Sequence, residues 1–229
     1  SMMIKGNFSA PNNASNAQSA LNCTSLNASR LSFQAKANQL SRSFPVIYLD
    51  PSDTSQMTGF IERNTISNPT SNSAIEIFPA SASEMDLVIK QNFISGSAGG
   101  GTIVLNPPGG PDTFIASLTI HNNTIQSENE GAFAFDNLAG GMDTIRFFEN
   151  VCLSKKSNGI ANHNGGLMIV DIYNNVMFTN ETNSLSYTGV DASTLTCTTI
   201  LGNQTNGALS LSATAPAELQ VQSSTLSAE

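Results

Sequence analysis

The stretch Ile120-His121-Asn122-Asn123-Thr124-Ile125-Gln126 contains the pattern that decides the fold. Its second asparagine stands between two apolar residues, one three positions before it and one two positions after it. This arrangement returns along the chain every 25 to 31 residues, with a last interval of 21 residues. The repeated positions are Asn7, Asn38, Asn64, Asn92, Asn123, Asn150, Asn175 and Asn203, with Ser224 as a degenerate ninth copy. A period of this length indicates a solenoid, in which each repeat is one structural unit stacked on the next.

Each repeat contains two segments in which apolar and polar residues alternate, which is typical of strands buried on one face. The first segment leads into the asparagine, and the third and fifth residues before it are predominantly apolar. The second segment starts about ten residues later, as in Ile103/Leu105 and Phe133/Phe135. We therefore expect each coil to contain a strand, an asparagine corner, a short strand, a loop and another strand. Neighbouring coils should pair in parallel and supply each other's core.

An asparagine suits the corner of such a coil for two reasons. Its backbone tolerates the left-handed conformation, so we expect the asparagine itself to adopt it. Its side-chain amide can donate a hydrogen bond to one stacked neighbour and accept one from the other. The sequence therefore predicts an internal ladder of stacked side chains. Its members are Asn64, Asn92, Asn123, Asn150, Asn175 and Asn203.

The repeat pattern predicts a single domain over residues 1–229, with about 8–9 coils in all. Residues 38–226 should form regular coils, whereas residues 1–37 are less regular and are expected to be irregular coils or a cap. Residues 13–26 are compatible with a short helix or with a ragged first coil, and we favour the coil. Coil motifs run to both ends of the sequence, which suggests a segment of a longer solenoid.

Composition excludes several classes of partner. Only 11% of residues are charged, the formal net charge is -8, and there are nine Lys plus Arg, so a nucleic-acid partner is not expected. No run approaches the ~18 apolar residues of a membrane span. The three cysteines, Cys23, Cys152 and Cys197, have no C-x-x-C spacing and cannot all pair. Cys152 occupies an inward position, two residues after its asparagine, and should be a buried thiol.

The asparagine corner resembles the asparagine ladder of the pectate-lyase-like superfamily of right-handed parallel β-helix proteins. Phe147-Phe148-Glu149-Asn150 matches an F-x-x-N element, and Gly100-Gly101-Thr102-Ile103 is similar to a G-G-A-[I/L/V] element. These two elements are paired in the passengers of chlamydial polymorphic membrane proteins, which are autotransporters. The resemblance implies an all-β, right-handed, single-stranded parallel β-helix. It also implies a bacterial, secreted or surface-exposed adhesive passenger.

The sequence contains no recognisable catalytic constellation. There is no Asp-Asp pair, no Gly-His-Gly and no Arg-x-Pro-x-x-Arg, and no Walker loop or His-Glu-x-x-His is present. His163 lies in Asn162-His163-Asn164-Gly165 without a carboxylate pair beside it, and we interpret it as a loop histidine. We therefore expect no cofactor and no metal site, and a protein without catalytic activity is favoured.

The residue two positions before each asparagine should point outward and stack on its equivalent in the next coil. Adjacent Phe148 and Tyr173 would then form an exposed aromatic pair that could stack on sugar rings or contact a partner protein. The alternative is that a loop, or the rest of a larger protein, covers them. We also expect exposed ion pairs between Glu62 and Lys90 and between Arg146 and Asp171. The candidate ligand-binding residues are Glu62, Lys90, His121, Phe148 and Tyr173, and Leu201 continues their column.

These features lead to three hypotheses about function. The first is a non-enzymatic protein at the outer cell surface or outside the cell, mediating adhesion to a carbohydrate or to a host or cell-surface protein. The second is a carbohydrate-active enzyme, either a polysaccharide lyase or a glycoside hydrolase. The third is a structural segment of a larger surface protein. A carboxylate cluster in a groove lined by the Gly-Gly loops would favour the enzyme, whereas a flat aromatic face would favour binding.

Overall fold

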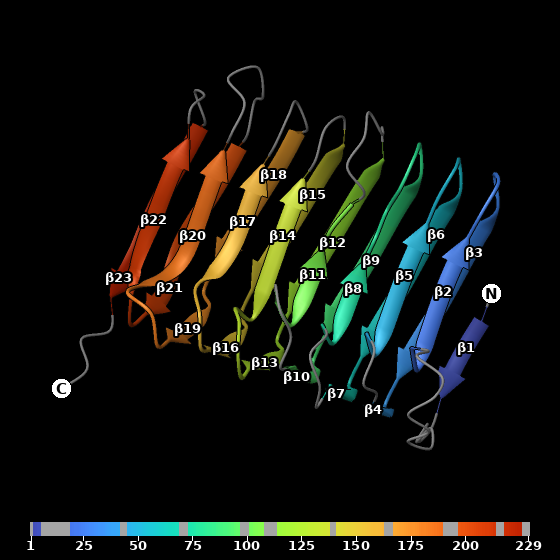
Figure 1. Ribbon diagram of the computed structural model, residues 1–229, viewed down its shortest axis with the longest axis horizontal. Coiled ribbons are helices and arrows are strands. Elements are labelled where there is room, and N and C mark those ends of the chain that lie inside the picture. Colours follow the sequence, from blue (N-terminus) through green and yellow to red (C-terminus); the bar gives the residue numbers. More distant parts are fainter. Residues whose placement is uncertain are drawn as a thin grey trace.

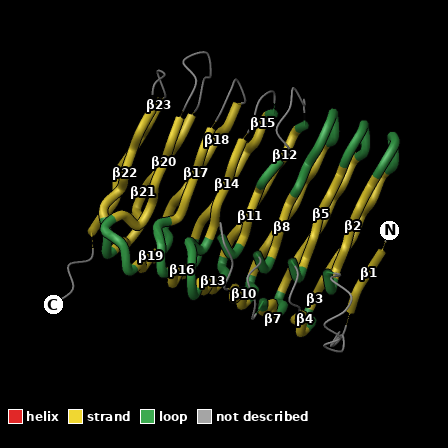
Figure 2. Tube along the Cα trace, viewed as in Figure 1, coloured by secondary structure: helices red, strands yellow, loops and turns green. Residues whose placement is uncertain are grey.

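The computed structural model describes residues 2–5, 19–41, 45–68, 73–96, 101–107, 114–137, 141–162, 167–189, 197–213 and 218–225. These residues form β-strands joined by turns, with no helix among them. The strands stack coil upon coil into an elongated β-solenoid, with the described N-terminal strand at one end and the C-terminal strand at the other (Figures 1 and 2). The predicted all-β parallel β-helix is therefore confirmed.

Each complete coil contributes a long strand, a short strand and a third strand. The long strands are β3 (Arg30–Lys36), β6 (Gln56–Glu62), β9 (Glu84–Lys90), β12 (Ile115–His121), β15 (Met142–Phe148) and β18 (Leu167–Tyr173). The short strands are β4 (Gln39–Ser41), β7 (Thr65–Ser67), β10 (Phe93–Gly96), β13 (Thr124–Ser127), β16 (Val151–Ser154) and β19 (Val176–Thr179). The third strands are β2 (Leu21–Ser25), β5 (Ile47–Pro51), β8 (Ile75–Ile77), β11 (Ile103–Leu105), β14 (Phe133–Asn137), β17 (Asn158–Asn162), β20 (Asn183–Gly189) and β22 (Ala208–Ala213). The remaining strands are β1 (Met2–Lys5), β21 (Cys197–Thr205) and β23 (Glu218–Thr225).

The described residues contain six coils with all three strands, from β3–β5 to β18–β20, and incomplete coils on either side. The expected 8–9 coils overestimate the complete ones. One reason is that β21 continues past Asn203 as a single strand. Near the N-terminus, β2 is a strand from Leu21, where a short helix over residues 13–26 was the alternative. The part of that segment before residue 19 lies outside the described residues.

All strand pairs are parallel, and they give the solenoid three faces. The long strands and the short strands form the long-strand face and the short-strand face, which join through β21 into one sheet. The third strands form a separate sheet, the third-strand face, in the order β2-β5-β8-β11-β14-β17-β20-β22. Pairing of β12 with both β9 and β15 proceeds without a register shift. Equivalent residues of successive coils therefore lie side by side.

The core consists of the inward columns that the sequence predicts. The side chains three positions before the ladder asparagines are almost completely inaccessible, as in Ile89, Ile120 and Phe147, each with 0% exposure. The ring of Phe147 packs against Phe133, with centroids 4.5 Å apart. Cys152 is also fully buried, as predicted, and burial raises the pKa of its thiol far above the ordinary range. Burial of Cys23 raises the pKa of its thiol to about 11.

The ladder runs without interruption from Asn38 to Asn203. In each step the backbone N–H and the side-chain Nδ2 of one asparagine donate to Oδ1 of the next, as between Asn92 and Asn123, where both bonds measure 2.9 Å. The same Nδ2 of Asn92 also donates to the carbonyl of Ile61 in the preceding coil. The amide thus has partners on both sides although the residue is buried. The other side chain-to-side chain steps are Asn38 to Asn64, Asn64 to Asn92, Asn123 to Asn150, Asn150 to Asn175, and Asn175 to Asn203.

The prediction that the ladder asparagine itself is left-handed is wrong. The positive φ belongs to the residue before it, as in Gln91 (56°) and Glu149 (55°). The turn made there directs the asparagine side chain into the interior, where the stacked amides are its partners. The degenerate copy at Ser224 is also displaced by one position. An irregularity after Leu201 places Ser223, not Ser224, beside Asn203. Asn7 lies outside the described residues.

Candidate interaction surface

The long-strand face brings the predicted outward residues into one column, which we call the aromatic column. Pairing in register places Glu62 beside Lys90 and Lys90 beside His121. The column continues from His121 to Phe148, then to Tyr173, and ends at Leu201. His121, Phe148 and Tyr173 are half-buried, whereas Leu201 is exposed.

The three rings of the column form a continuous stack. The centroids of His121 and Phe148 are 4.8 Å apart with an interplanar angle of 6°. Phe148 and Tyr173 repeat this spacing of 4.8 Å, with an angle of 3°. This distance equals the usual separation of paired strands, about 4.8 Å. Because neighbouring rings cover both faces of Phe148, only the edge of its ring is left to contact a partner. Stacking on a sugar would require a ring face that is not covered.

His121 occupies the end of the stack next to Lys90. Its Nδ1 lies 3.0 Å from Nδ2 of Asn122, and because an amide NH₂ can only donate, Nδ1 is the acceptor. Burial and the neighbouring charge of Lys90 lower the pKa of His121, and the carboxylate of Glu149 opposes this only in part. The imidazole is therefore neutral at neutral pH, with its proton on Nε2.

Tyr173 has the opposite electrostatic setting at the other end of the stack. Burial raises the pKa of its phenol, and the carboxylates of Asp171 and Glu149 add to the effect, while Arg146 opposes it. The hydroxyl therefore stays protonated well above neutral pH and remains able to donate a hydrogen bond. Beyond Tyr173, the apolar side chain of Leu201 is 37% exposed and extends the column.

The prediction that Glu62 forms an ion pair with Lys90 is wrong, because Glu62 pairs with other residues. Glu62 is buried, and its carboxylate lies 3.3 Å from Nζ of Lys36 and 3.4 Å from Nε of Arg63. The preceding coil and the coil of Glu62 itself therefore supply its ion-pair partners, and the following coil does not. Burial disfavours ionisation of Glu62, but the hydrogen bond and charge of Lys36, with the charges of Lys90 and Arg63, hold its pKa below the ordinary value.

The second predicted ion pair is present. Nε of Arg146 lies 3.9 Å from Oδ2 of Asp171 on the neighbouring strand. Both side chains are well exposed to solvent, so the pair contributes less than about 1 kcal/mol to stability.

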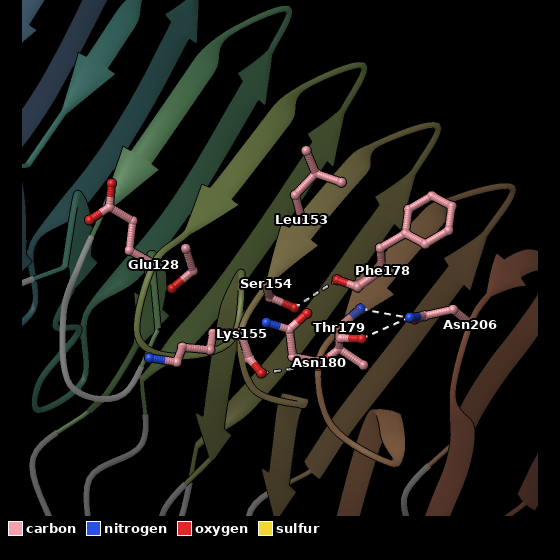
Figure 3. A pocket seen from close by; sticks show the side chains of 9 residues that line it. Glu128, Leu153, Ser154, Lys155, Phe178, Thr179, Asn180 and Asn206 are labelled. Atoms are coloured by element: carbon pink, nitrogen blue, oxygen red, sulfur yellow. Dashed lines mark hydrogen bonds between the residues drawn. The ribbon is translucent and has the colours of Figure 1, made fainter. Parts of the chain in front are cut away.

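The short-strand face carries an apolar surface that the sequence analysis missed. Val151, Leu153 and Phe178 are 38–39% exposed, and Leu153 pairs in register with Phe178. A groove of about 670 Å³ opens beside them, between these strands and the loops that follow (Figure 3). The sequence did contain a signal for this surface. In Val151-Cys152-Leu153 and Val176-Met177-Phe178 the outward residues are apolar, and so are the inward ones. Both faces of β16 and β19 are therefore apolar.

The third-strand face has a second groove, of about 410 Å³. Its floor is made of small residues, including Ala134, Gly159 and Ala161, and a Cβ added to Gly159 would meet nothing within 4 Å. The carboxyl groups of Glu76 and Asp136 also line it. Burial raises the pKa of Glu76. This groove contains two acidic side chains that the sequence analysis did not bring together.

Other predictions about the site concern metals, membranes and His163. In the described part of the chain, no group of three or more His, Cys, Asp and Glu side chains is arranged to hold a metal ion. Among the same residues there is no helix with the length and apolar character needed to cross a membrane. His163 lies outside the described residues.

The fold and the stacked columns define the chain as a parallel β-solenoid with an internal asparagine ladder. Comparison of the sequence with protein families, with curated proteins and with solved structures finds no match.

Proposed function

We propose that this chain is a non-enzymatic, secreted or cell-surface β-helix that mediates adhesion or interaction, and that the aromatic column contacts its partner. One observation carries the proposal: His121, Phe148 and Tyr173 form an unbroken ring stack on the outside of a regular parallel sheet. Half-buried aromatic side chains gathered on a protein surface are typical of contact surfaces. The low content of charged residues and the resemblance to autotransporter passengers support a location outside the cell.

The geometry of the column favours a protein partner over a carbohydrate at this surface. Stacking holds each ring between its neighbours, so binding would freeze few side-chain rotamers and lose little entropy. The rings present edges to the partner, together with the Tyr173 hydroxyl and the Leu201 side chain. Edges of this kind suit aromatic and aliphatic side chains of another protein. Face-on stacking of a sugar would require Phe148 to leave its place between His121 and Tyr173.

An adhesion assay tests this proposal. Surfaces coated with the chain are exposed to a panel of bacterial and eukaryotic cells, and the cells retained after washing are counted. We expect the double variant Phe148→Ser/Tyr173→Ser to retain several-fold fewer cells of at least one type, because truncated aromatic anchors commonly account for much of the binding energy. Treating the cells with protease should abolish the difference, whereas treating them with glycosidases should not.

The matched control is the double variant Phe60→Ser/Phe93→Ser. It removes two phenylalanines that are each 41% exposed and that lie outside the column. If the control loses as many cells as the column variant, adhesion depends on general hydrophobicity. If the column variant keeps full adhesion while circular dichroism shows it folded, the column is not the contact surface.

A second candidate function, a carbohydrate-active enzyme, is supported by the groove on the third-strand face. Two carboxyl groups are the usual catalytic pair for hydrolysis of a glycosidic bond, and one of them must be protonated to act as the acid. The raised pKa of Glu76 fits the acid, and Asp136 is the second carboxyl group in the lining of the groove. Incubation with a panel of polysaccharides should then release reducing ends, and Glu76→Gln should abolish the release while Glu84→Gln does not. Absence of products from the whole panel would exclude this activity on those substrates.

A further inference from the structure

The groove on the short-strand face lies where β13, β16 and β19 run into their following loops. Phe178 and Leu153 form its apolar side, and the side chains of Glu128, Lys155 and Asn180 lie around it (Figure 3). Its volume of about 670 Å³ falls within the range of small-molecule sites, about 300–1,000 Å³. The groove is widely open to solvent, so a polar ligand fits it better than a small apolar one.

The walls of the groove are held by hydrogen bonds within the protein. Asn206 binds the backbone of Thr179 twice, accepting from its N–H at 2.9 Å and donating to its carbonyl at 2.7 Å. The hydroxyl of Ser154 donates to the carbonyl of Phe178 at 3.2 Å. These bonds fix the backbone of β19 and the loop after it. The groove is therefore formed before any ligand arrives, which reduces the entropic cost of binding.

The groove has three polar side chains available for a ligand. Glu128, Lys155 and Asn180 are exposed, and their side chains make no hydrogen bond with any other described residue. The negative charge of Glu128 and the positive charge of Lys155 balance each other. The lining as a whole therefore favours a neutral ligand. Together the three side chains offer both hydrogen-bond donors and acceptors, which is the combination that hydroxyl groups require.

The apolar side of the groove differs from the aromatic column in one decisive respect. The ring of Phe178 stacks on no other aromatic ring in the described residues, and the side chain is 38% exposed beside Leu153. An aromatic face of this kind can pack against the C–H face of a pyranose ring. Phe178 thus lacks the aromatic neighbours that cover both faces of Phe148.

We propose that this groove is a binding site for a neutral oligosaccharide. A sugar ring packs on Phe178 and Leu153, and its hydroxyls hydrogen-bond to Glu128, Lys155 and Asn180. The site is separate from the aromatic column, and the proposal does not depend on the function suggested for that column.

Titrations followed by ¹H–¹⁵N NMR test the proposal. The probes are cellobiose, maltose, lactose, mannobiose and N,N′-diacetylchitobiose, each added to millimolar concentration because sites for short sugars are weak. We expect at least one of them to shift the resonances of Leu153, Phe178 and Asn180 in a saturable way. Phe178→Ala should weaken that binding about tenfold or more, which corresponds to about 1.4 kcal/mol. Glu128→Gln should weaken it as well.

Two control variants separate this site from others. Phe93→Ala removes a similarly exposed phenylalanine of the short-strand face outside the groove and should leave the affinity unchanged. Phe148→Ser/Tyr173→Ser should also leave it unchanged. The proposal is overturned if none of the five sugars shifts these resonances, if Phe178→Ala binds as well as the native chain, or if the shifts lie only at the aromatic column. Saturable binding of short neutral peptides at the groove, without binding of sugars, would overturn it too.

Discussion

The backbone N–H and the side-chain amide of Asn123 both donate to the same oxygen, Oδ1 of Asn150, at 3.0 Å. One side-chain oxygen therefore joins two coils by two hydrogen bonds in a buried position. Each coil is linked to the next through such an oxygen. Removal of one asparagine leaves polar groups on two coils without partners. Each ladder asparagine therefore contributes to the free energy of unfolding through both of the coils that it joins.

Replacement of Asn123 by alanine tests this directly. The change removes the acceptor for the backbone N–H and the amide of Asn92, and it removes the amide that bonds to Asn150. Each buried polar group left without a partner costs about 1–3 kcal/mol, so we expect a loss of about 3 kcal/mol or more in the free energy of unfolding. Urea denaturation measures it. The control Asn122→Gly, at the neighbouring exposed position, should change stability by less than about 1 kcal/mol, and equal losses in the two variants would contradict the role of the ladder.

The left-handed residue before each ladder asparagine gives a second prediction. Glu149 has φ of 55°, which glycine adopts without strain and which a β-branched residue adopts only with difficulty. We expect Glu149→Gly to stabilise the protein by up to about 1 kcal/mol and Glu149→Val to destabilise it by about 1–2 kcal/mol. The melting temperatures of the two variants should therefore change in opposite directions. If both variants lower the melting temperature, the side chain of Glu149 matters more for stability than its backbone conformation.

The interior gives a third prediction, at the contact between Gly59 and Phe33. A Cβ built at Gly59 would lie 2.3 Å from two ring carbons of Phe33 in the preceding coil. Gly59→Ala should therefore force the ring or the backbone to move, at a cost of about 1–3 kcal/mol. In the background of Phe33→Leu the same substitution should cost at least about 1 kcal/mol less. A double-mutant cycle measures this coupling, and strict additivity would mean that the two residues do not compete for the same space.

The fourth prediction concerns pH. The pKa of His121 lies below its ordinary value of 6.5 because of burial and the charge of Lys90. The unfolded chain then takes up a proton at a higher pH than the folded chain does. Stability should therefore decline as the pH falls from the unfolded pKa toward the lower folded pKa, and should not change further below it through this group.

NMR titration of the imidazole Cε1–H signal measures this pKa, and the variant His121→Gln assigns the signal, since the chain has two histidines. We expect Lys90→Gln to raise the pKa of His121, because it removes a neighbouring positive charge. We also expect His121→Gln to reduce the loss of stability over the same pH range. A pKa at or above 6.5 in the native chain would show that the ring is more hydrated than its position in the stack indicates.

The sequence predicted the inward columns and the ladder because a fixed period imposes the same environment on Ile89, Ile120 and Phe147. It did not predict which residue is left-handed. Asparagine is the more permissive type in isolation, but burial of its amide requires the turn to fall one residue earlier. Gly202 at that position was the available hint, with φ of 62°.

The candidate site was predictable only as a column of residues. The register follows from the repeat, but the plane of the Phe148 ring depends on its side-chain rotamer and on the neighbouring rings. The ion pair of Glu62 was misassigned because a residue in a stack has a neighbour on each side, and the pattern does not say which one its carboxylate contacts. The groove beside Phe178 depends on the conformation of three loops, for which the repeat carries no information.

The ladder has a consistent direction. Each asparagine from Asn38 to Asn175 donates to the next one along the chain, and each from Asn64 to Asn203 accepts from the one before it. Any coil therefore offers the coil before it and the coil after it the same pair of complementary ends. A duplicated coil inserted between two others could form the ladder hydrogen bonds to both neighbours, whatever its outward side chains are. The length of the rod can thus change by whole coils during evolution while the core stays the same, and the surfaces on its three faces can diversify one coil at a time.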